Sequence, residues 1–444
     1  MSRPQGLVVR MDGFGLPAGY LASDATQAIS FAYDDHYIAL GGPPLSLSMP
    51  VAQVNFGDVA TRAFFDNLLP ENDQMQRVLD REGLARDDIV GLLAHLGSDC
   101  SGAISCLPVG ADPIKVPGVL AEDYELLAPE MVAEIIHSLA ERQRLPDALT
   151  DPSPVAGVQR KIALTHTPQG FAKPKPGKKV PTTHILKVPE TRLGRDARLE
   201  EAAARLASAV GLEVSIPQAL VVDGVDALLI ERFDRVVRDG VVYRLHQEDF
   251  AQALGLPATL KYQRNGAPGR RFDGAAIAGL LDRTETPALA RKAFLSATLF
   301  NLLIGNTDNH AKNHGLLYRH GRAPVLTPLY DLLPSRMNPD FNDQLSFDIG
   351  AADHPDKITA ADLFAFFGAF GFSRAATLRF IDNVAVPMIE ALEHASLGLS
   401  RERLKDFDDL IGRETEQFVE TLGLHIKVRE RDYFPKSRYA LAAS

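Results

Sequence analysis

Short hydrophobic runs broken by glycine and aspartate characterise the first part of the chain. The segments "GLVVRMDG", "AGYLAS" and "ISFAYDD" predict short β-strands. Two later segments, "TRAFFDNLLPEN" and "DDIVGLLAHLG", are predicted to be helical. Proline and glycine then accumulate in "AISCLPVGADPIKVPG", which predicts a domain boundary or linker near residues 107–120.

The middle of the chain has a strand, turn, strand pattern after one predicted helix, "APEMVAEIIHSLAER". From about residue 155, "GVQRKIALTH" and "THILKVP" predict strands on either side of the basic, proline-broken segment "FAKPKPGKKVP". The alanine-rich segment "RLEEAAARLASAVGL" predicts a helix that ends near a glycine. The segments "PQALVVDG" and "VDALLIERFDR" predict a β-hairpin.

Beyond about residue 245 the pattern becomes helical. The clearest helix is "LARKAFLSATLFNLLIG", where Leu295, Leu299, Leu302 and Leu303 fall on one stripe and Gly305 follows as a stop. A hairpin is predicted in "GLLYRHGRAPVLTPLYD", and three further helices in "AADLFAFFGAF", "RFIDNVAVPMIEALEHA" and "RLKDFDDLIGRETEQFVETLGL". This order predicts an α+β architecture with separate lobes rather than alternating β-α units.

Composition narrows the class of protein. The chain has 444 residues, of which 45% are hydrophobic, and a chain of this length usually forms two or three domains. Its net charge of -10 argues against a protein that binds nucleic acid or an anionic membrane by itself. The two cysteines fit neither a zinc knuckle nor a disulfide scaffold. With no apolar segment long enough for a signal peptide or a membrane span, we expect a soluble, cytoplasmic protein.

The polar segment "NTDNHAKNHGLLY", Asn306 to Tyr318, directly follows the clearest apolar helix. The chain has no standard phosphate-binding loop. It contains no G-x-G-x-x-G, and "GFAKPKPGKKV" has the wrong length for a P-loop. A zinc hydrolase is one alternative, since His310 and His314 are four residues apart, but Ala311 occupies the position of the general-base glutamate. A polar loop with scattered surface charges is another.

The spacing of a protein-kinase catalytic loop fits this segment better. Kinases place a catalytic aspartate and a metal-binding asparagine five residues apart, with a second metal-binding aspartate downstream. Asp308 and Asn313 have this spacing, and Asp331 follows in "PLYDLLPS". Asp308 can orient a substrate hydroxyl and accept its proton, while Asn313 and Asp331 offer the hard oxygen ligands that magnesium prefers.

A lysine and a glutamate upstream complete the kinase order. Lys187 lies near the end of a predicted strand, from which it could reach the phosphates of ATP. Glu200, on the following predicted helix, could pair with it and hold it in place. Such pairs are common on protein surfaces, so the weight comes from the order: strand lysine, helix glutamate, hinge-like "LIERFDR", then the D-x-x-x-x-N loop.

The chain resembles the HipA family, the kinase toxins of bacterial HipA–HipB toxin–antitoxin modules. The resemblance rests on motifs spread over almost the full length: "PLSLSMP", "FFDNLLPEN", "GSDCSGA", "VAGVQRKIAL", "PTTHILKVP", "ERFDR", "HQEDFAQALGLP" and "TDNHAKNH…LTPLYDLLPS". It implies an α+β, two-lobed protein-kinase-like fold with an extra N-terminal β-rich subdomain and an all-α C-terminal lobe. The corresponding divisions would be residues 1–107, 125–233 for the N-lobe and 234–444 for the C-lobe.

The resemblance also implies roles for site residues. Asp308 would be the catalytic base, Asn313 and Asp331 the Mg²⁺ ligands, and Lys187 the lysine that contacts the ATP phosphates.

The resemblance further implies where the nucleotide lies. The adenine would lie against the hinge backbone at Glu231 and Phe233. The segment "VAGVQRK" would cover the phosphates, with nucleotide contacts from Val155, Ala156, Gly157, Val158 and Lys161.

By this resemblance the chain is an ATP- and Mg²⁺-dependent serine/threonine protein kinase and a toxin that phosphorylates a translation component, such as an aminoacyl-tRNA synthetase, to cause growth arrest and persistence. Its partner would be a HipB-like DNA-binding antitoxin, through which the chain reaches DNA. The alternative is a catalytically weak or silent co-repressor that acts through its antitoxin.

One position departs from the family pattern. The family's autophosphorylation serine sits immediately before the V/I-A-G of the phosphate-covering loop, whereas here Pro154 occupies that position and Ser153 precedes it. Phosphate on a serine there adds nearly two negative charges beside the nucleotide phosphates and can eject the loop. Either Ser153 serves in a shifted register, or the chain lacks this self-inactivating switch.

Overall fold

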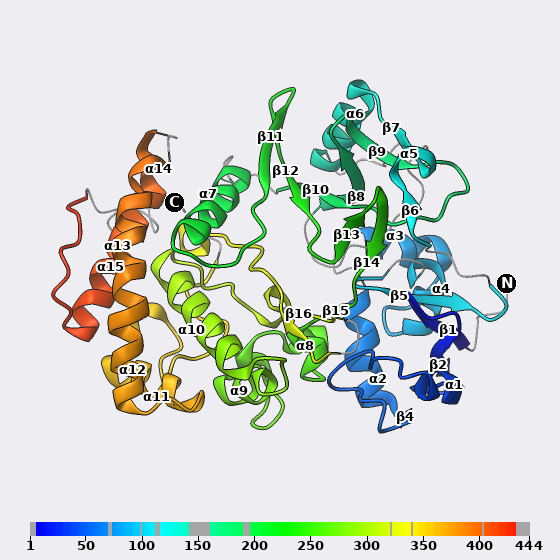
Figure 1. The fold of residues 1–444 in the computed structure, drawn as a ribbon, viewed down its shortest axis with the longest axis horizontal. Helices are drawn as coiled ribbons and strands as arrows, with labels where there is room; N and C mark the ends of the chain where they lie inside the picture. The colour runs from blue at the N-terminus through cyan, green and yellow to red at the C-terminus, as the bar shows by residue number, and fades with distance from the viewer. Residues whose placement is uncertain are drawn as a thin grey trace. The chain divides into compact units, whose positions relative to one another are not determined.

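The chain divides into two compact units, shown in Figure 1. The computed structural model describes residues 6–69, 73–97, 100–111, 116–141, 160–189, 196–319, 322–338, 341–401 and 404–431. Unit 1 comprises Met1–Glu190, Gln218–Ala258 and Gly315–Val325, and unit 2 comprises Thr191–Pro217, Thr259–His314 and Leu326–Ser444. The regular elements of the described residues are helices and antiparallel sheets, which confirms the predicted α+β class. The three-part division stays a prediction.

Unit 1 begins with a five-stranded antiparallel sheet in the order β4-β3-β2-β1-β5. Alternate residues of a strand share a face, so Leu7, Val9 and Met11 all enter one core, together with Phe64 and Phe65. The strands are β1 (Gly6–Met11), β2 (Pro17–Ser23), β3 (Ile29–Tyr33), β4 (Asn55–Phe56) and β5 (Ile104–Pro108). The helices are α1 (Asp35–Ala39), α2 (Asp58–Phe65), η1 (Asp66–Leu68), α3 (Asp73–Glu82) and α4 (Ile89–Leu96).

A second sheet of unit 1 has six strands in the order β11-β12-β10-β8-β9-β7. Helix α6 (Pro129–Ala140) covers one face, where Ile135 and Ile136 share a core with Leu164 and Leu186. The predicted hairpin β11–β12 is confirmed, and its two-residue turn, Asp223–Gly224, has positive φ at both positions, as such turns require. The strands are β7 (Tyr124–Leu126), β8 (Arg160–Thr167), β9 (Gly170–Pro174), β10 (His184–Val188), β11 (Gln218–Val222) and β12 (Val225–Glu231).

Two small sheets have the orders β13-β14-β6 and β15-β16-β17. The β13–β14 hairpin was not predicted, although its turn, Asp239–Gly240, has the same Asp-Gly signature and positive φ values. The elements are β6 (Gly118–Val119), α5 (Leu120–Asp123), β13 (Arg235–Arg238), β14 (Val241–Arg244), β15 (Gln247–Asp249), α8 (Phe250–Ala253), β16 (Gly315–Leu317) and β17 (Val325–Leu326).

Buried polar contacts hold the N-terminal part of unit 1 to β15 and α8. The backbone N–H of Leu47 donates to Oε1 of Glu248 at 2.9 Å, and the hydroxyl of Ser48 donates to the carbonyl of Gln252 at 2.7 Å. These residues lie in "PLSLSMP" and "HQEDFAQALGLP", two of the motifs quoted above. Both motifs therefore act in part by satisfying each other's buried polar groups.

A second polar cluster in unit 1 joins two further motifs. The carboxylate of Asp234 accepts a bidentate pair of hydrogen bonds from Arg232 at 2.9 and 2.8 Å, and lies 2.8 Å from Nη1 of Arg235. The same carboxylate accepts the backbone N–H of Gly102 at 3.3 Å. "ERFDR" and "GSDCSGA" are thus joined through one buried carboxylate, whose three donors compensate its removal from water.

Unit 2 is mainly helical. Its long helix α10 (Pro287–Leu303) starts with a proline, which is well suited to a first turn, and is almost completely buried from Phe294 onward. The other helices are α7 (Asp196–Ala209), α9 (Gly274–Leu281), α11 (Ala360–Ala369), α12 (Arg374–Phe380), α13 (Val386–Ala395), α14 (Leu397–Arg401) and α15 (Lys405–Leu422). Short turns are η4 (Ala258–Leu260), η5 (Gln263–Asn265), η6 (Ala311–Asn313), η7 (Ser335–Met337) and η8 (Pro355–Lys357). No described helix is both long and apolar enough to cross a bilayer.

The helix predicted over "RFIDNVAVPMIEALEHA" is interrupted. A π-helical turn, η9 (Ile381–Ala385), lies between α12 and α13. Pro387 lies in the first turn of α13 and has no backbone N–H, so the hydrogen bond that a regular helix would form there is lost.

We expect Glu248→Gln to stabilise the protein relative to wild type as pH rises. Burial raises the pKa of Glu248 to about 7, above its ordinary value of 4.5. Because the folded-state pKa is the higher one, ionisation of Glu248 lowers the stability of the wild type between about pH 4.5 and 7. The amide has no such cost, so the variant should gain up to about 3 kcal/mol relative to wild type by pH 8. Thermal melting from pH 5 to 8 measures this difference.

The exposed Glu122 offers a matched control in the same unit. Glu122→Gln should melt in parallel with wild type at every pH. A Glu248→Gln difference that stays constant across the pH range would contradict the assignment.

Candidate functional site

The polar segment after α10 starts from a fixed point in unit 2. Gly305 has a φ of 68°, in the left-handed region that favours glycine at a helix end. A Cβ there would lie 2.8 Å from Cδ2 of Leu410 in α15. The next residue, Asn306, donates its backbone N–H to the carbonyl of Asn301 at 2.8 Å and its side-chain Nδ2 to Oδ1 of Asn301 at 2.7 Å. The direction in which the chain leaves α10 is therefore set.

Hydrogen bonds bring Asp308 and Asn313 together. Oδ1 of Asn306 accepts the backbone N–H of Asp308 at 3.1 Å, and Nδ2 of Asn313 donates to the carbonyl of Asp308 at 2.8 Å. Because the amide nitrogen of Asn313 makes this contact, its Oδ1 is the atom that can coordinate a cation. The five-residue spacing noted in the sequence thus corresponds to a direct contact.

Two carboxylates share this part of unit 2. Burial raises the pKa of Asp308, and the negative charge of Asp331 raises it further. The hydroxyl of Tyr262, which donates to Oδ1 of Asp308 at 2.7 Å, lowers that pKa, as do the charges of Lys261 and Arg264. Asp331 is exposed and has a φ of 56°, which is unusual for a residue other than glycine. Two repelling carboxylates and an amide oxygen are a donor set that fits a hard divalent cation.

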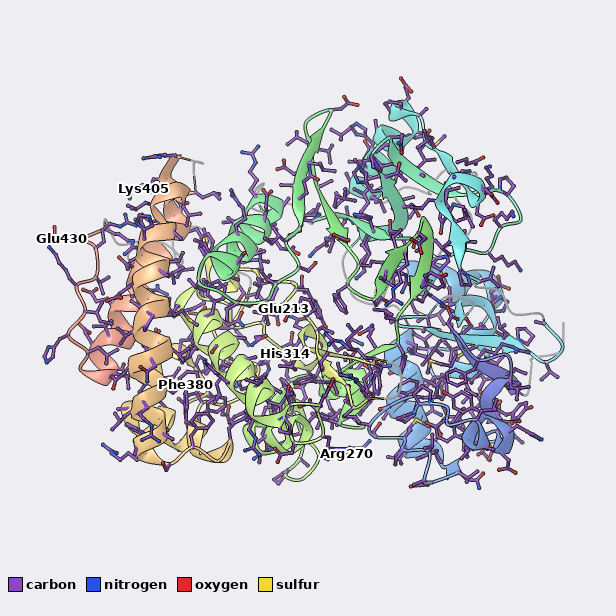
Figure 2. The ribbon with its side chains drawn as sticks, in the orientation of Figure 1. Glu213, Arg270, His314, Phe380, Lys405 and Glu430 are labelled. Carbon is purple, nitrogen blue, oxygen red and sulfur yellow. The ribbon has the colours of Figure 1, made fainter. Side chains whose placement is uncertain are left out.

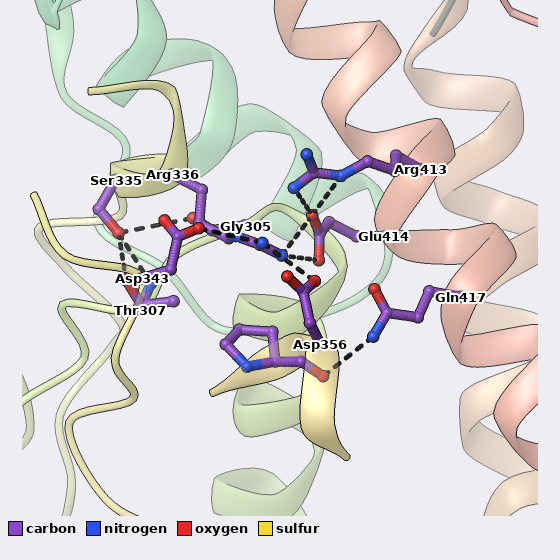
Figure 3. A network of polar contacts seen from close by, with 10 residues as sticks. Gly305, Thr307, Ser335, Arg336, Asp343, Asp356, Arg413, Glu414 and Gln417 are labelled. Atoms are coloured by element: carbon purple, nitrogen blue, oxygen red, sulfur yellow. Dashed lines mark hydrogen bonds and ion pairs between the residues drawn. The ribbon is translucent and has the colours of Figure 1, made fainter. Parts of the chain in front are cut away.

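Three polar residues bond to the start of the loop, and Figure 3 shows the contacts of two of them, Ser335 and Arg336. The hydroxyl oxygen of Ser335 accepts the backbone N–H of Thr307 at 2.8 Å, and the hydroxyl of Ser346 donates to the carbonyl of Thr307 at 2.8 Å. The backbone N–H of Arg336 donates to the carbonyl of Gly305 at 3.0 Å. The segment that follows Asp331 is therefore bonded to the segment that carries Asp308.

Buried charges tie this segment to α15 (Figure 3). Nη1 of Arg336 donates to both carboxylate oxygens of Glu414 at 2.7 Å, and these two side chains are only 1% and 4% exposed. Nη2 of Arg336 lies 3.2 Å from Asp343 and 3.1 Å from Asp356, which are both more exposed. Arg413 also donates to Glu414. A buried arginine is stable only when it is paired in this way.

In unit 1, two lysines face each other across neighbouring strands. Lys187 of β10 is directly opposite Lys161 of β8, so both side chains lie on the sheet face away from α6. Ile185 and Ala163 form the next opposite pair on the same face. Lys187 is only 5% exposed. Two lysines next to the apolar Ile185 and Ala163 give this sheet face a chemistry that fits an anionic ligand with an apolar part.

The other residues predicted to bind the nucleotide lie in β12, just after it, in α7 and outside the described residues. Glu231 ends β12, opposite His184, and Phe233 is half-buried two residues later. Glu200 is a buried residue of α7 in unit 2. The adenine contacts stay predictions. Ser153, Val155, Ala156, Gly157 and Val158 lie outside the described residues.

Both histidines of the loop pack against aromatic rings. His314 lies in the interior of unit 2, with ring centroids of Phe272 and Phe294 at 6.1 and 5.1 Å (Figure 2). Burial lowers the pKa of His314 to about 3, so the ring is neutral. His310 packs against the ring of Tyr262 at 5.1 Å. No three His, Cys, Asp or Glu side chains of the described residues gather as a metal site, so the zinc alternative finds no ligand set there.

Sequence reasoning missed Tyr262, Ser335 and Arg336. Ser335 closes the quoted motif "LTPLYDLLPS", and Arg336 follows it, so the motif itself was a usable signal. Tyr262 lies in "LKYQRNG", which has no periodic pattern and no motif that marks a site.

The aspartate and asparagine that are bonded in one loop of unit 2, with a second aspartate nearby, match the groups of a protein-kinase catalytic loop. Comparisons agree. A family model for the HipA-like C-terminal domain matches residues 153–392, and one for the HipA N-terminal domain matches residues 7–107.

Relatives cover nearly the whole chain. Y4mE of Sinorhizobium fredii, named as a kinase, is 32% identical over 89% of this chain and 95% of its own length. The serine/threonine-protein kinase toxin HipA of Shewanella oneidensis is 31% identical over 90% of this chain and 92% of its own. A solved Shewanella oneidensis HipA, in complex with HipB and operator DNA, has a TM-score of 0.77 and 28% identity, and the match covers 94% of this chain and 98% of that one. The chain belongs to the HipA family and is a kinase with a kinase-like α+β fold.

We expect Glu414→Gln to destabilise unit 2 strongly. The substitution removes the buried charge opposite Arg336 and leaves a buried guanidinium with only its two more exposed partners. Breaking a buried ion pair on one side costs about 3–5 kcal/mol. Chemical denaturation followed by circular dichroism measures the loss.

Asp343→Asn is the matched control, because it removes a 45% exposed carboxylate from the same arginine. An exposed ion pair contributes about 0–1 kcal/mol, so this variant should unfold close to wild type. Equal losses in the two variants would argue against the buried pair as the dominant anchor.

Proposed function

We propose that this chain is an ATP- and Mg²⁺-dependent serine/threonine protein kinase that acts in the cytoplasm as the toxin of a toxin–antitoxin module. The observation that carries the proposal is the bonded loop in which Asn313 holds the carbonyl of Asp308, with the charge of Asp331 close enough to raise the pKa of Asp308. Family membership supports the same activity.

The loop residues divide the work of phosphoryl transfer. Asp308 orients the acceptor hydroxyl of a serine or threonine and takes up its proton. Asn313 and Asp331 hold Mg²⁺ through hard oxygen atoms, and the ion supplies charge neutralisation for the phosphate oxygens. Hydrogen bonds of Asn306 and Thr307 keep these groups in place. Catalysis of phosphoryl transfer depends mostly on such positioning, because the protein has little covalent chemistry to perform.

ATP binds to the face of strands β8 and β10 that points away from α6 in unit 1. Lys187 and Lys161 contact the ATP phosphates, and Glu200 acts with Lys187. The adenine lies against the backbone at Glu231 and Phe233. The phosphates are covered by Val155, Ala156, Gly157 and Val158, and Ser153 is the candidate for autophosphorylation.

A HipB-like antitoxin is the proposed partner. The solved relative was captured with HipB and operator DNA, and the net charge of -10 on this chain favours contact with DNA mainly through such a partner. The proposed substrate is a component of translation, such as an aminoacyl-tRNA synthetase, whose phosphorylation would halt growth.

Asp308→Asn tests the proposal. With labelled ATP and Mg²⁺, wild type should transfer phosphate to itself or to one of a panel of aminoacyl-tRNA synthetases. The variant should lose roughly 10²-fold or more in rate, because the amide cannot accept the proton. Asp382→Asn, on an exposed position of the same unit, is the control and should keep the wild-type rate.

The outcome also separates the alternative function. A wild type that binds ATP yet transfers no phosphate to any acceptor favours a silent co-repressor that acts through its antitoxin. Transfer that survives Asp308→Asn unchanged would remove Asp308 from the mechanism.

Lys187→Met tests the nucleotide face. The apolar stem is kept and the charge is lost, so ATP affinity should fall about 10- to 100-fold, the effect of one or two hydrogen bonds to a charged group. Titration with a fluorescent ATP analogue measures it. Lys292→Met, on an exposed position of α10, should bind as wild type does. Unchanged affinity of Lys187→Met would place the phosphates elsewhere.

A further inference from the structure

We propose that Tyr262 is a positioning residue that fixes the catalytic carboxylate of Asp308 and so selects Oδ2 as the oxygen that receives the substrate proton. This inference rests on the proposed kinase function. It assigns a role to a side chain that the kinase-loop spacing does not include.

The contact is made at one oxygen of the carboxylate. The hydroxyl of Tyr262 donates to Oδ1 of Asp308 at 2.7 Å, the usual length of an O–H···O hydrogen bond. In the part of the chain that the structure describes, no side-chain donor is bonded to Oδ2. The last torsion of an aspartate is otherwise loosely defined, so a single anchor on one oxygen decides where the other one points.

The backbone of Asp308 is fixed independently of its side chain. Its N–H donates to Asn306 and its carbonyl accepts from Asn313. Neither of these contacts restrains the carboxylate group itself. Tyr262 supplies the restraint that the loop lacks.

Tyr262 is itself held on both sides. The residue before it, Lys261, accepts the backbone N–H of Ala311 through its carbonyl at 3.0 Å, which bonds the two segments directly. The Tyr262 ring meets His310 edge to face at 5.1 Å, and the guanidinium of Arg264 lies 4.0 Å from the ring centroid. An anchor with so little freedom can transmit a precise position, which a catalytic group needs to within about 0.5 Å.

The residue after Tyr262 extends this support. The backbone N–H of Gln263 donates to the carbonyl of Ser346 at 2.8 Å, and the backbone N–H of Asp348 donates to Oε1 of Gln263 at 2.9 Å. Ser346 in turn donates to Thr307 of the loop. Tyr262 and the loop therefore share one frame within unit 2.

A second tyrosine provides a matched control. The hydroxyl of Tyr330 donates to the carbonyl of Lys312 at 2.9 Å, so it supports the same loop without bonding to the carboxylate. Tyr262→Phe and Tyr330→Phe each remove one hydroxyl and one hydrogen bond to this loop. Only the first should release Asp308.

The test compares the full-length wild type with Tyr262→Phe, Tyr330→Phe, Asp308→Asn and the Tyr262→Phe/Asp308→Asn double variant. Phosphate transfer from labelled Mg·ATP to casein, used as a generic acceptor, gives kcat and KM for ATP. Tyr262→Phe should lower kcat by roughly 10- to 100-fold, the effect of a small misplacement of a catalytic group, with KM for ATP unchanged. Its melting temperature should stay within about 5 °C of wild type.

The double variant separates positioning from general loop support. If Tyr262 acts through the carboxylate, its removal should change the residual rate of Asp308→Asn by less than about threefold. A full additional loss in the double variant, or an equal loss of kcat in Tyr330→Phe, would assign Tyr262 a merely structural role and overturn the inference.

Failure of the inference is distinguishable from failure of the proposed function. An active wild type, an inactive Asp308→Asn and a fully active Tyr262→Phe would reject the inference alone. A wild type that transfers no phosphate to casein, to itself or to the synthetase panel would reject both.

Discussion

The site in unit 2 depends on the closure of the loop between Asn306 and Asn313. A run of polar side chains after a buried helix is stable only if its backbone groups find partners, and here the loop's own amides provide them. The side chain of Asn306 bonds backward to α10 and forward to Asp308, and Asn313 closes the turn. The same bonds that satisfy the buried backbone also set the spacing of the functional groups. Stability and chemistry therefore share one set of contacts, so most changes inside this loop would affect both.

Several family motifs away from the loop have a structural explanation. Leu47 and Ser48 bond to Glu248 and Gln252, while Asp234 gathers two arginines and a backbone N–H. A buried polar group is costly unless it has its hydrogen-bond partners. Such contacts therefore favour the one arrangement of these segments in which all partners meet. Motifs of this kind reveal the family without marking the chemistry. The kinase chemistry was predicted from the D-x-x-x-x-N spacing and the order of elements, and the toxin role from the resemblance to the family.

The sequence was informative where a local rule applied. Helix α10, its stop at Gly305 and the β11–β12 hairpin follow from periodicity and turn chemistry, which act within a few residues. The β13–β14 hairpin carried the same Asp-Gly signature and could have been predicted from it. By contrast, the contact of Tyr262 with Asp308 joins residues 46 positions apart through an irregular segment. No spacing rule describes such a contact, because it depends on how the whole of unit 2 packs.

Unit 2 contains two groups of charged side chains with different electrostatic surroundings. Arg336 and Glu414 are buried and paired with each other, as a stable interior requires. Asp308 differs, because burial and the negative charge of Asp331 both raise its pKa, although it accepts a hydrogen bond from Tyr262. Burial and like charge make ionisation of Asp308 unfavourable, and Asp331 adds an unfavourable backbone conformation. A divalent cation beside Asn313 would relieve the repulsion between the two carboxylates, so these charges are consistent with the proposed reaction.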